Sequence, residues 1–126
     1  MSFPLLVRWS ATLAWTAFTV ALMSRPSNVG IVHDLSLFFG GTELTDAAGH
    51  VVLFGTLAAL WYWTLTGRLK RQRALLLATG IGVAVGIATE FAQYFVPERG
   101  VALIDILADC LGPLIVAGIL YALTTS

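Results

Sequence analysis

Residues 68–96 decide the fold, and they read RLKRQRALLLATGIGVAVGIATEFAQYFV. The first six residues of this stretch include four basic side chains, whereas the 23 residues that follow include one charged side chain, Glu90. A helix needs roughly 20 apolar residues to cross the hydrocarbon core of a bilayer. We therefore predict a membrane span at residues 74–96, preceded by a basic segment that stays in water.

Three more apolar runs of similar length extend this prediction to the whole chain. They occupy residues 5–23, 46–66 and 101–123. Hydrophobic residues make up 58% of the 126 residues and charged residues only 11%, against roughly 25% charged in soluble domains. This composition excludes a water-soluble globule and predicts an all-α, polytopic membrane protein, a bundle of four transmembrane helices in a single domain over residues 1–126. The net charge is zero, so no nucleic acid is expected as a partner.

Local signals refine the ends and the interior of these spans. Residues 5–23 also fit the core of a signal peptide, but their length and the lack of a clear cleavage site after them favour a retained span. Thr45 and Asp46 suit the cap of the second helix. Gly112 and Pro113 lie inside the fourth run, where proline is expected to kink the helix.

Basic residues predict the orientation of the bundle, because positive charge is retained on the cytoplasmic side. The basic cluster at residues 68–73 falls on one side together with Arg8, and Arg25 and Arg99 fall on the other. We therefore expect both termini in the cytoplasm and residues 24–45 outside. All seven acidic residues then lie in outer loops or in the outer halves of spans. Binding of anionic lipid is an alternative role for the basic cluster.

Three of the predicted spans each carry a pair of polar residues on one helical face, spaced three or four residues apart. An ionisable side chain in a span costs roughly 2.5 to 3.5 kcal/mol, so such residues are expected to face a partner or a cavity. The pairs have similar depths, which predicts one cluster in the outer leaflet, with a nearby arginine as its cation. The expected ligand-binding residues are Asp46, His50, Glu90, Gln93, Arg99, Asp105 and Asp109.

A stripe of small residues leads to this cluster. Gly82, Gly86 and Glu90 recur every fourth residue, and small residues at that spacing allow membrane helices to approach closely. We interpret the two glycines as a packing device that supports the cluster without belonging to it.

The polar residues resemble the pattern of the VanZ-like family of small bacterial integral membrane proteins. The resemblance covers residues 46 to 126 and rests on an acid and a histidine at the start of one span, followed by a Glu-x-x-Gln, Arg and Asp series. The matching residues are Asp46, His50, Glu90, Gln93, Arg99, Asp105 and Gly112. Two positions depart from the pattern: Ala47 stands where the family usually has Lys, and Asp109 where it usually has Asn. Both departures make the site more acidic.

The resemblance implies a location in the bacterial inner (plasma) membrane and a role in the cell envelope. In the namesake of the family, that role is low-level tolerance to the glycopeptide antibiotic teicoplanin. Combined with the acidic cluster, this favours binding of an amphiphilic or lipid-linked envelope molecule.

Three alternatives stay open at this point. The cluster could serve only to lock the helices of a structural membrane subunit together. A histidine among carboxylates could also support a metal- or carboxylate-dependent hydrolase or transferase, although no nucleophile or metal motif is present. A transport pathway is disfavoured because the inner halves of two spans, residues 57–62 and 74–82, contain no charge. We expect no cofactor and no metal, and the sequence does not define the oligomeric state.

Overall fold

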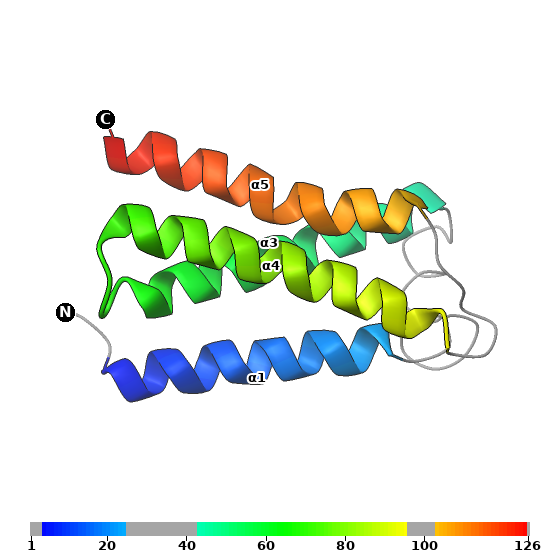
Figure 1. The fold of residues 1–126 in the computed structure, drawn as a ribbon, viewed down its shortest axis with the longest axis horizontal. Coiled ribbons are helices and arrows are strands. Elements are labelled where there is room, and N and C mark those ends of the chain that lie inside the picture. The colour runs from blue at the N-terminus through cyan, green and yellow to red at the C-terminus, as the bar shows by residue number, and fades with distance from the viewer. Residues whose placement is uncertain (1–3, 25–42, 96–102, 126) are drawn as a thin grey trace.

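The four apolar runs form four long helices that lie side by side (Figure 1). The computed structural model describes residues 4–24, 43–95 and 103–125. The helices are α1 (Leu5–Met23), α3 (Glu43–Leu65), α4 (Arg71–Gln93) and α5 (Leu103–Thr125). Each contains a stretch long and apolar enough to cross a membrane, so the predicted all-α membrane bundle is confirmed. Both termini lie at the end of the bundle where the α3–α4 turn is found (Figure 1).

The helix ends differ from the predicted spans by a few residues. α3 begins at Glu43, so Thr45 and Asp46 lie inside the helix and their prediction as a cap was wrong. Acidic side chains are stabilising in the first turn of a helix, and this favours the earlier start. α4 begins at Arg71 rather than Ala74, because arginine and glutamine are good helix formers and nothing there ends the helix. Of the predicted outer loop, residues 24–45, residues 25–42 lie outside the described residues and residues 43–45 belong to α3 instead.

Helices α3 and α5 approach each other closely at Gly112. A Cβ atom added to Gly112 would collide with the carbonyl oxygen of Val51 and lie 2.8 Å from the amide nitrogen of Gly55. Both obstacles are backbone atoms, which have little room to move. In a bilayer this kind of close packing replaces the hydrophobic force as the main attraction between helices. α5 runs without interruption through the adjacent Pro113.

The small-residue stripe of α4 is a packing surface, as predicted, and the structure shows that its partner is α5. A Cβ atom on Gly82 would lie 2.9 Å from the ring of Pro113, and one on Gly86 would lie 2.7 Å from the Cβ atom of Asp109. The two glycines therefore set how closely α4 approaches α5.

Helix α1 is joined to α3 by hydrogen bonds along much of its length. Thr12 and Thr64 share a hydrogen bond of 2.6 Å between their hydroxyl oxygens. The indole of Trp15 donates to the carbonyl of Leu53 at 3.2 Å. Further along, the indole of Trp61 donates to a hydroxyl of α1 at 3.1 Å. The contact of α1 with the bundle therefore combines these hydrogen bonds with apolar packing, in which Leu22 and Met23 join Phe54 and Leu57 in the hydrophobic core.

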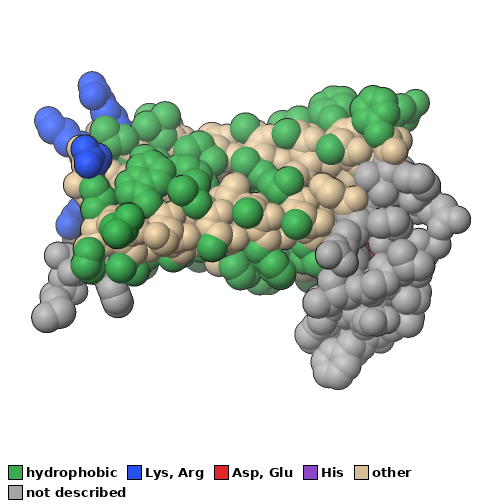
Figure 2. Space-filling model, turned by 90° about the horizontal axis from the view of Figure 1, so that it is seen from below, with side chains coloured by type: hydrophobic (Ala, Val, Ile, Leu, Met, Phe, Trp, Pro, Cys, Tyr) green, Lys and Arg blue, Asp and Glu red, His purple; other side chains and the backbone are tan. Residues whose placement is uncertain are grey.

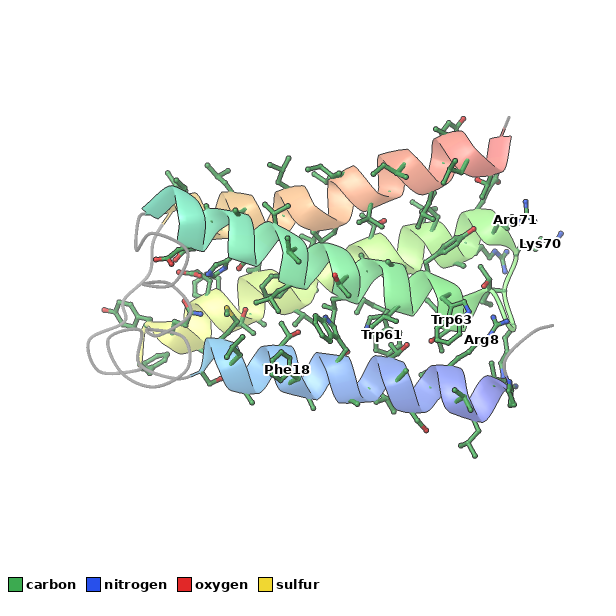
Figure 3. All side chains as sticks on the ribbon, turned by 180° about the vertical axis from the view of Figure 1, so that it is seen from behind. Arg8, Phe18, Trp61, Trp63, Lys70 and Arg71 are labelled. Atoms are coloured by element: carbon green, nitrogen blue, oxygen red, sulfur yellow. The ribbon has the colours of Figure 1, made fainter. Side chains whose placement is uncertain are left out.

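The same interface ends with an arginine at the basic end of the bundle. Arg8 donates to the carbonyl of Trp63 at 2.8 Å, and its guanidinium carbon lies 5.2 Å from the centre of the Trp63 ring. Figure 3 shows Arg8 and Trp63 facing each other between α1 and α3, at the end where Lys70 and Arg71 lie. Arg8 thus satisfies a backbone carbonyl and packs on an aromatic face while keeping its charge near the end of the helix.

The α3–α5 contact predicts unequal effects for two glycine substitutions on one helix. We expect Gly112→Ala to lower the free energy of unfolding by about 2 kcal/mol or more, because the methyl group meets fixed backbone atoms. Gly118→Ala is the control: no atom lies within 4 Å of its added Cβ. That substitution should leave stability unchanged or raise it by up to about 1 kcal/mol. Reversible unfolding in mixed detergent micelles, followed by circular dichroism, measures both. Equal effects would contradict the packing described here.

Candidate functional site

Buried polar side chains gather at the end of the bundle opposite the termini. They come from three helices: His50 from α3, Glu90 and Gln93 from α4, and Asp105 and Asp109 from α5. All except Asp105 are more than nine-tenths buried, and the Asp105 side chain is 21% exposed. We call these five residues the polar cluster. Its position in the fold follows from the antiparallel order of the helices, since α3 and α5 begin, and α4 ends, at this end.

The shortest contact in the cluster joins α3 to α5. Nδ1 of His50 and Oδ1 of Asp109 lie 2.5 Å apart, and both side chains are buried. The other ring nitrogen, Nε2, lies 3.9 Å from Oδ1 of Asp105. Phe54 stacks on the imidazole with 6.3 Å between ring centres. The histidine is therefore held by one carboxylate, faces a second and is covered by an aromatic ring.

Helix periodicity explains why both carboxylates reach the same histidine. Asp105 and Asp109 are four residues apart and share one face of α5. Phe54 is likewise four residues after His50 on α3, which places it beside the imidazole. Sequence reasoning overlooked Phe54, although its spacing from His50 was available as a signal.

Glycine packing brings Glu90 to the level of Asp105. Gly86 lies against Asp109, as described above. Glu90 lies one helical turn after Gly86 on α4, and Asp105 lies one turn before Asp109 on α5. Because the two helices are antiparallel, both steps lead toward the end of the bundle opposite the termini. Gly86 therefore supports the cluster by close packing, as predicted.

Gln93 ties the cluster to α1. Its amide nitrogen donates to the carbonyl oxygen of Met23 at 2.9 Å, and the side chain is buried. Its amide oxygen is also buried and accepts no hydrogen bond from the described residues. The sequence analysis did not foresee Met23, yet the last carbonyls of a helix lack partners within the helix and need donors from elsewhere.

Of the other two predicted site residues, the structure describes only Asp46, and it does not bring that side chain into the cluster. Asp46 lies one turn before His50 on α3, but its side chain is exposed and makes no hydrogen bond or ion pair with the part of the chain that the structure describes. Arg99 lies outside the described residues, so its pairing with the acids stays a prediction.

Charge is distributed very unevenly between the two ends of the molecule. The described side chains of Arg and Lys gather at the end that carries the termini (Figure 2). At the opposite end, Asp105 and Asp109 face His50, and Glu90 is buried on the neighbouring helix α4. The cluster can thus accept hydrogen bonds, attract a cationic group and move a proton through His50. No group of three or more His, Cys, Asp or Glu residues within the described ranges is arranged to hold a metal ion.

Comparison with known proteins supports the resemblance suggested by the polar residues. The model of the VanZ/LLP1 family matches residues 4–124, nearly the whole chain. No curated protein and no solved structure matches the chain.

The geometry of the cluster predicts that its two aspartates contribute unequally to stability. We expect Asp109→Ala to lower the free energy of unfolding by about 2 to 3 kcal/mol, because it leaves a buried imidazole nitrogen without its acceptor. Asp105→Ala should cost less than about 1 kcal/mol, because that carboxylate is farther from the ring and partly exposed. Unfolding in mixed micelles measures the difference. A larger loss from Asp105→Ala would show that Asp109 is not the main partner of His50.

Proposed function

The chain belongs to the VanZ/LLP1 family, and from this premise we propose that the polar cluster binds the head of an amphiphilic or lipid-linked envelope molecule. The apolar part of that molecule would lie along the helices, and no reaction is catalysed. We further propose that the protein resides in the bacterial plasma membrane with both termini in the cytoplasm, so that the cluster faces the outer leaflet.

One observation carries this proposal: four buried polar side chains from three contacting helices, α3, α4 and α5, lie at the same end of the span region. His50 and Asp109 contact each other between α3 and α5, and Glu90 and Gln93 are buried beside them on α4. Two of the four are carboxylic acids, which are expensive to place within a bilayer. A network needed only for packing could be built from uncharged groups at lower cost. Ionisable residues in such positions favour a functional role.

The chemistry of the cluster indicates the kind of head group it would accept. The cluster contains three carboxylates and a single histidine, and the buried amide oxygen of Gln93 is a further acceptor. Amines, hydroxyl-rich groups and metal-bridged groups all donate hydrogen bonds or positive charge to such a set. Around the cluster, Phe91, Leu103 and Leu107 are exposed on α4 and α5, and they offer apolar surface to an attached chain.

The proposed orientation and the family agree with this ligand class. Basic residues mark the opposite end as cytoplasmic by the positive-inside rule. The outer leaflet is where envelope precursors and lipid-bearing antibiotics are encountered. A role in tolerance to glycopeptides, which is associated with the family's namesake, is consistent with a protein that holds such a molecule.

A second candidate function, hydrolysis or group transfer within the membrane, is favoured by the His50–Asp109 contact. A carboxylate on Nδ1 orients an imidazole so that Nε2 can act as a general base. Here Nε2 lies near Asp105, which is a further acceptor for a proton.

A third interpretation is that the cluster only holds the helices together. It predicts that the purified protein retains no particular molecule.

Retention of lipids by the purified protein tests the binding proposal. We expect mass spectrometry to find an amphiphile that the wild type retains and that Glu90→Ala and Asp105→Ala lose by about tenfold, the effect of removing one hydrogen bond to a charged group. Thr79→Val is the matched control on α4, because it removes a hydroxyl that bonds only to the helix's own Leu75 carbonyl. If all four proteins retain the same molecules, the cluster is structural.

Teicoplanin tolerance of cells that express each variant separates binding from catalysis. Glu90→Gln keeps the shape and hydrogen-bonding capacity of the side chain but removes its charge and its ability to act as a base. A binding protein should keep part of its effect in this variant, whereas a hydrolase that uses Glu90 should lose almost all of it. Complete loss in a variant that folds and inserts normally would favour the enzyme.

A further inference from the structure

A cavity of about 180 Å³ opens at the basic end of the bundle, far from the polar cluster. It lies between the end of α3, the start of α4 and the end of α5. A single water needs only about 10 to 15 Å³, so the cavity has room for a much larger group. Its lining residues are Tyr62, Arg71, Gln72, Leu75, Tyr121 and Thr124.

The lining of this cavity combines one cation with hydrogen-bonding groups. Arg71 carries a planar guanidinium that can hold two phosphate oxygens at once. The Gln72 amide and the Tyr62 hydroxyl can donate hydrogen bonds. The Thr124 hydroxyl donates to the carbonyl of Leu120 at 2.8 Å, so it can accept a hydrogen bond from a hydroxyl of the ligand. Such a lining suits a phosphate that carries a hydroxylated substituent.

Electrostatics at the start of α4 also favour an anion. No side chain caps the N-terminus of α4, and its first turn contains no acidic residue. A helix N-terminus carries partial positive charge, and here it is surrounded by further cations, Lys70, Arg71 and Arg73. The buried carboxylates of the protein lie at the opposite end. The positive charge of the basic end therefore lacks a described counterion.

We propose that this cavity binds the phosphate head of an anionic phospholipid of the phosphatidylglycerol class from the adjacent leaflet. Basic pockets between transmembrane helices bind the phosphate-bearing head groups of anionic lipids such as cardiolipin. A lipid fits better than free phosphate because apolar surface continues from the cavity: Leu75 lines it, and Leu76 and Leu123 are exposed on the same ends of α4 and α5. This site is separate from the polar cluster and does not depend on the function proposed for it.

Native mass spectrometry of the full chain, reconstituted in nanodiscs of phosphatidylcholine and phosphatidylglycerol, tests the proposal. We expect the wild type to retain phosphatidylglycerol in preference to phosphatidylcholine. Arg71→Gln should reduce this retention by about tenfold, because it removes a charged hydrogen-bond donor to phosphate. Arg73→Gln is the matched control: it removes the same charge from the same helical turn but does not line the cavity, so retention should fall less than about twofold.

A second pair of variants tests the cavity without changing charge. Leu75→Trp fills the space and should also reduce phosphatidylglycerol retention by about tenfold. Leu77→Trp, at an exposed position of α4 that does not line the cavity, should leave retention unchanged. Equal losses from Arg71→Gln and Arg73→Gln would overturn the proposal, because they would indicate general attraction to a basic surface. Displacement of the lipid by inorganic phosphate alone would overturn the lipid assignment and leave a free-anion site.

Discussion

The His50–Asp109 contact is the interaction on which the acidic half of the bundle depends. Lipid tails are as apolar as the helices, so burial of hydrocarbon does little to hold membrane helices together. Close backbone packing and polar contacts take that role. Here the two occur together: Gly112 lets α5 approach α3, Gly86 lets it approach α4, and Asp109 lies between these glycines and reaches His50. The remaining residues of the polar cluster are positioned by this arrangement.

The departures from the family pattern gain a structural meaning from this contact. Asp109 replaces the usual Asn, and it is the carboxylate that holds the imidazole. Ala47 replaces the usual Lys, and its small side chain is buried on α3 beside the exposed Asp46. The family pattern would place a lysine at position 47, near these acids. In this chain that cation is missing, and among the described residues His50 is the basic side chain that faces Asp105 and Asp109. The acidity noted from the sequence is therefore concentrated around one titratable ring.

Much of the fold could be predicted from the sequence, because the length of an apolar run and the spacing of residues on a helix are local properties. They sufficed for four helices, for the face shared by Asp105 and Asp109, and for the role of Gly82 and Gly86 as a close-packing stripe. These local properties do not determine how each helix is rotated about its own axis relative to its neighbours. That rotation leaves Asp46 exposed although it is only one turn from His50, and it directs Gln93 to a backbone carbonyl of α1. The cavity at the basic end escaped prediction for the same reason, since its lining comes from three separate helices.

The separation of His50 and Asp109 in the chain has a consequence for how the protein is made. The two residues are 59 positions apart, and α4 is synthesised between them. At about 5 to 20 residues per second, α3 is complete several seconds before α5 emerges. During that time His50 can enter the membrane as a neutral ring, which a carboxylate cannot do without taking up a proton. Asp109 is synthesised later, when His50 is already in place. The order of synthesis therefore shortens the time for which the Asp109 carboxylate would be unpaired in the bilayer.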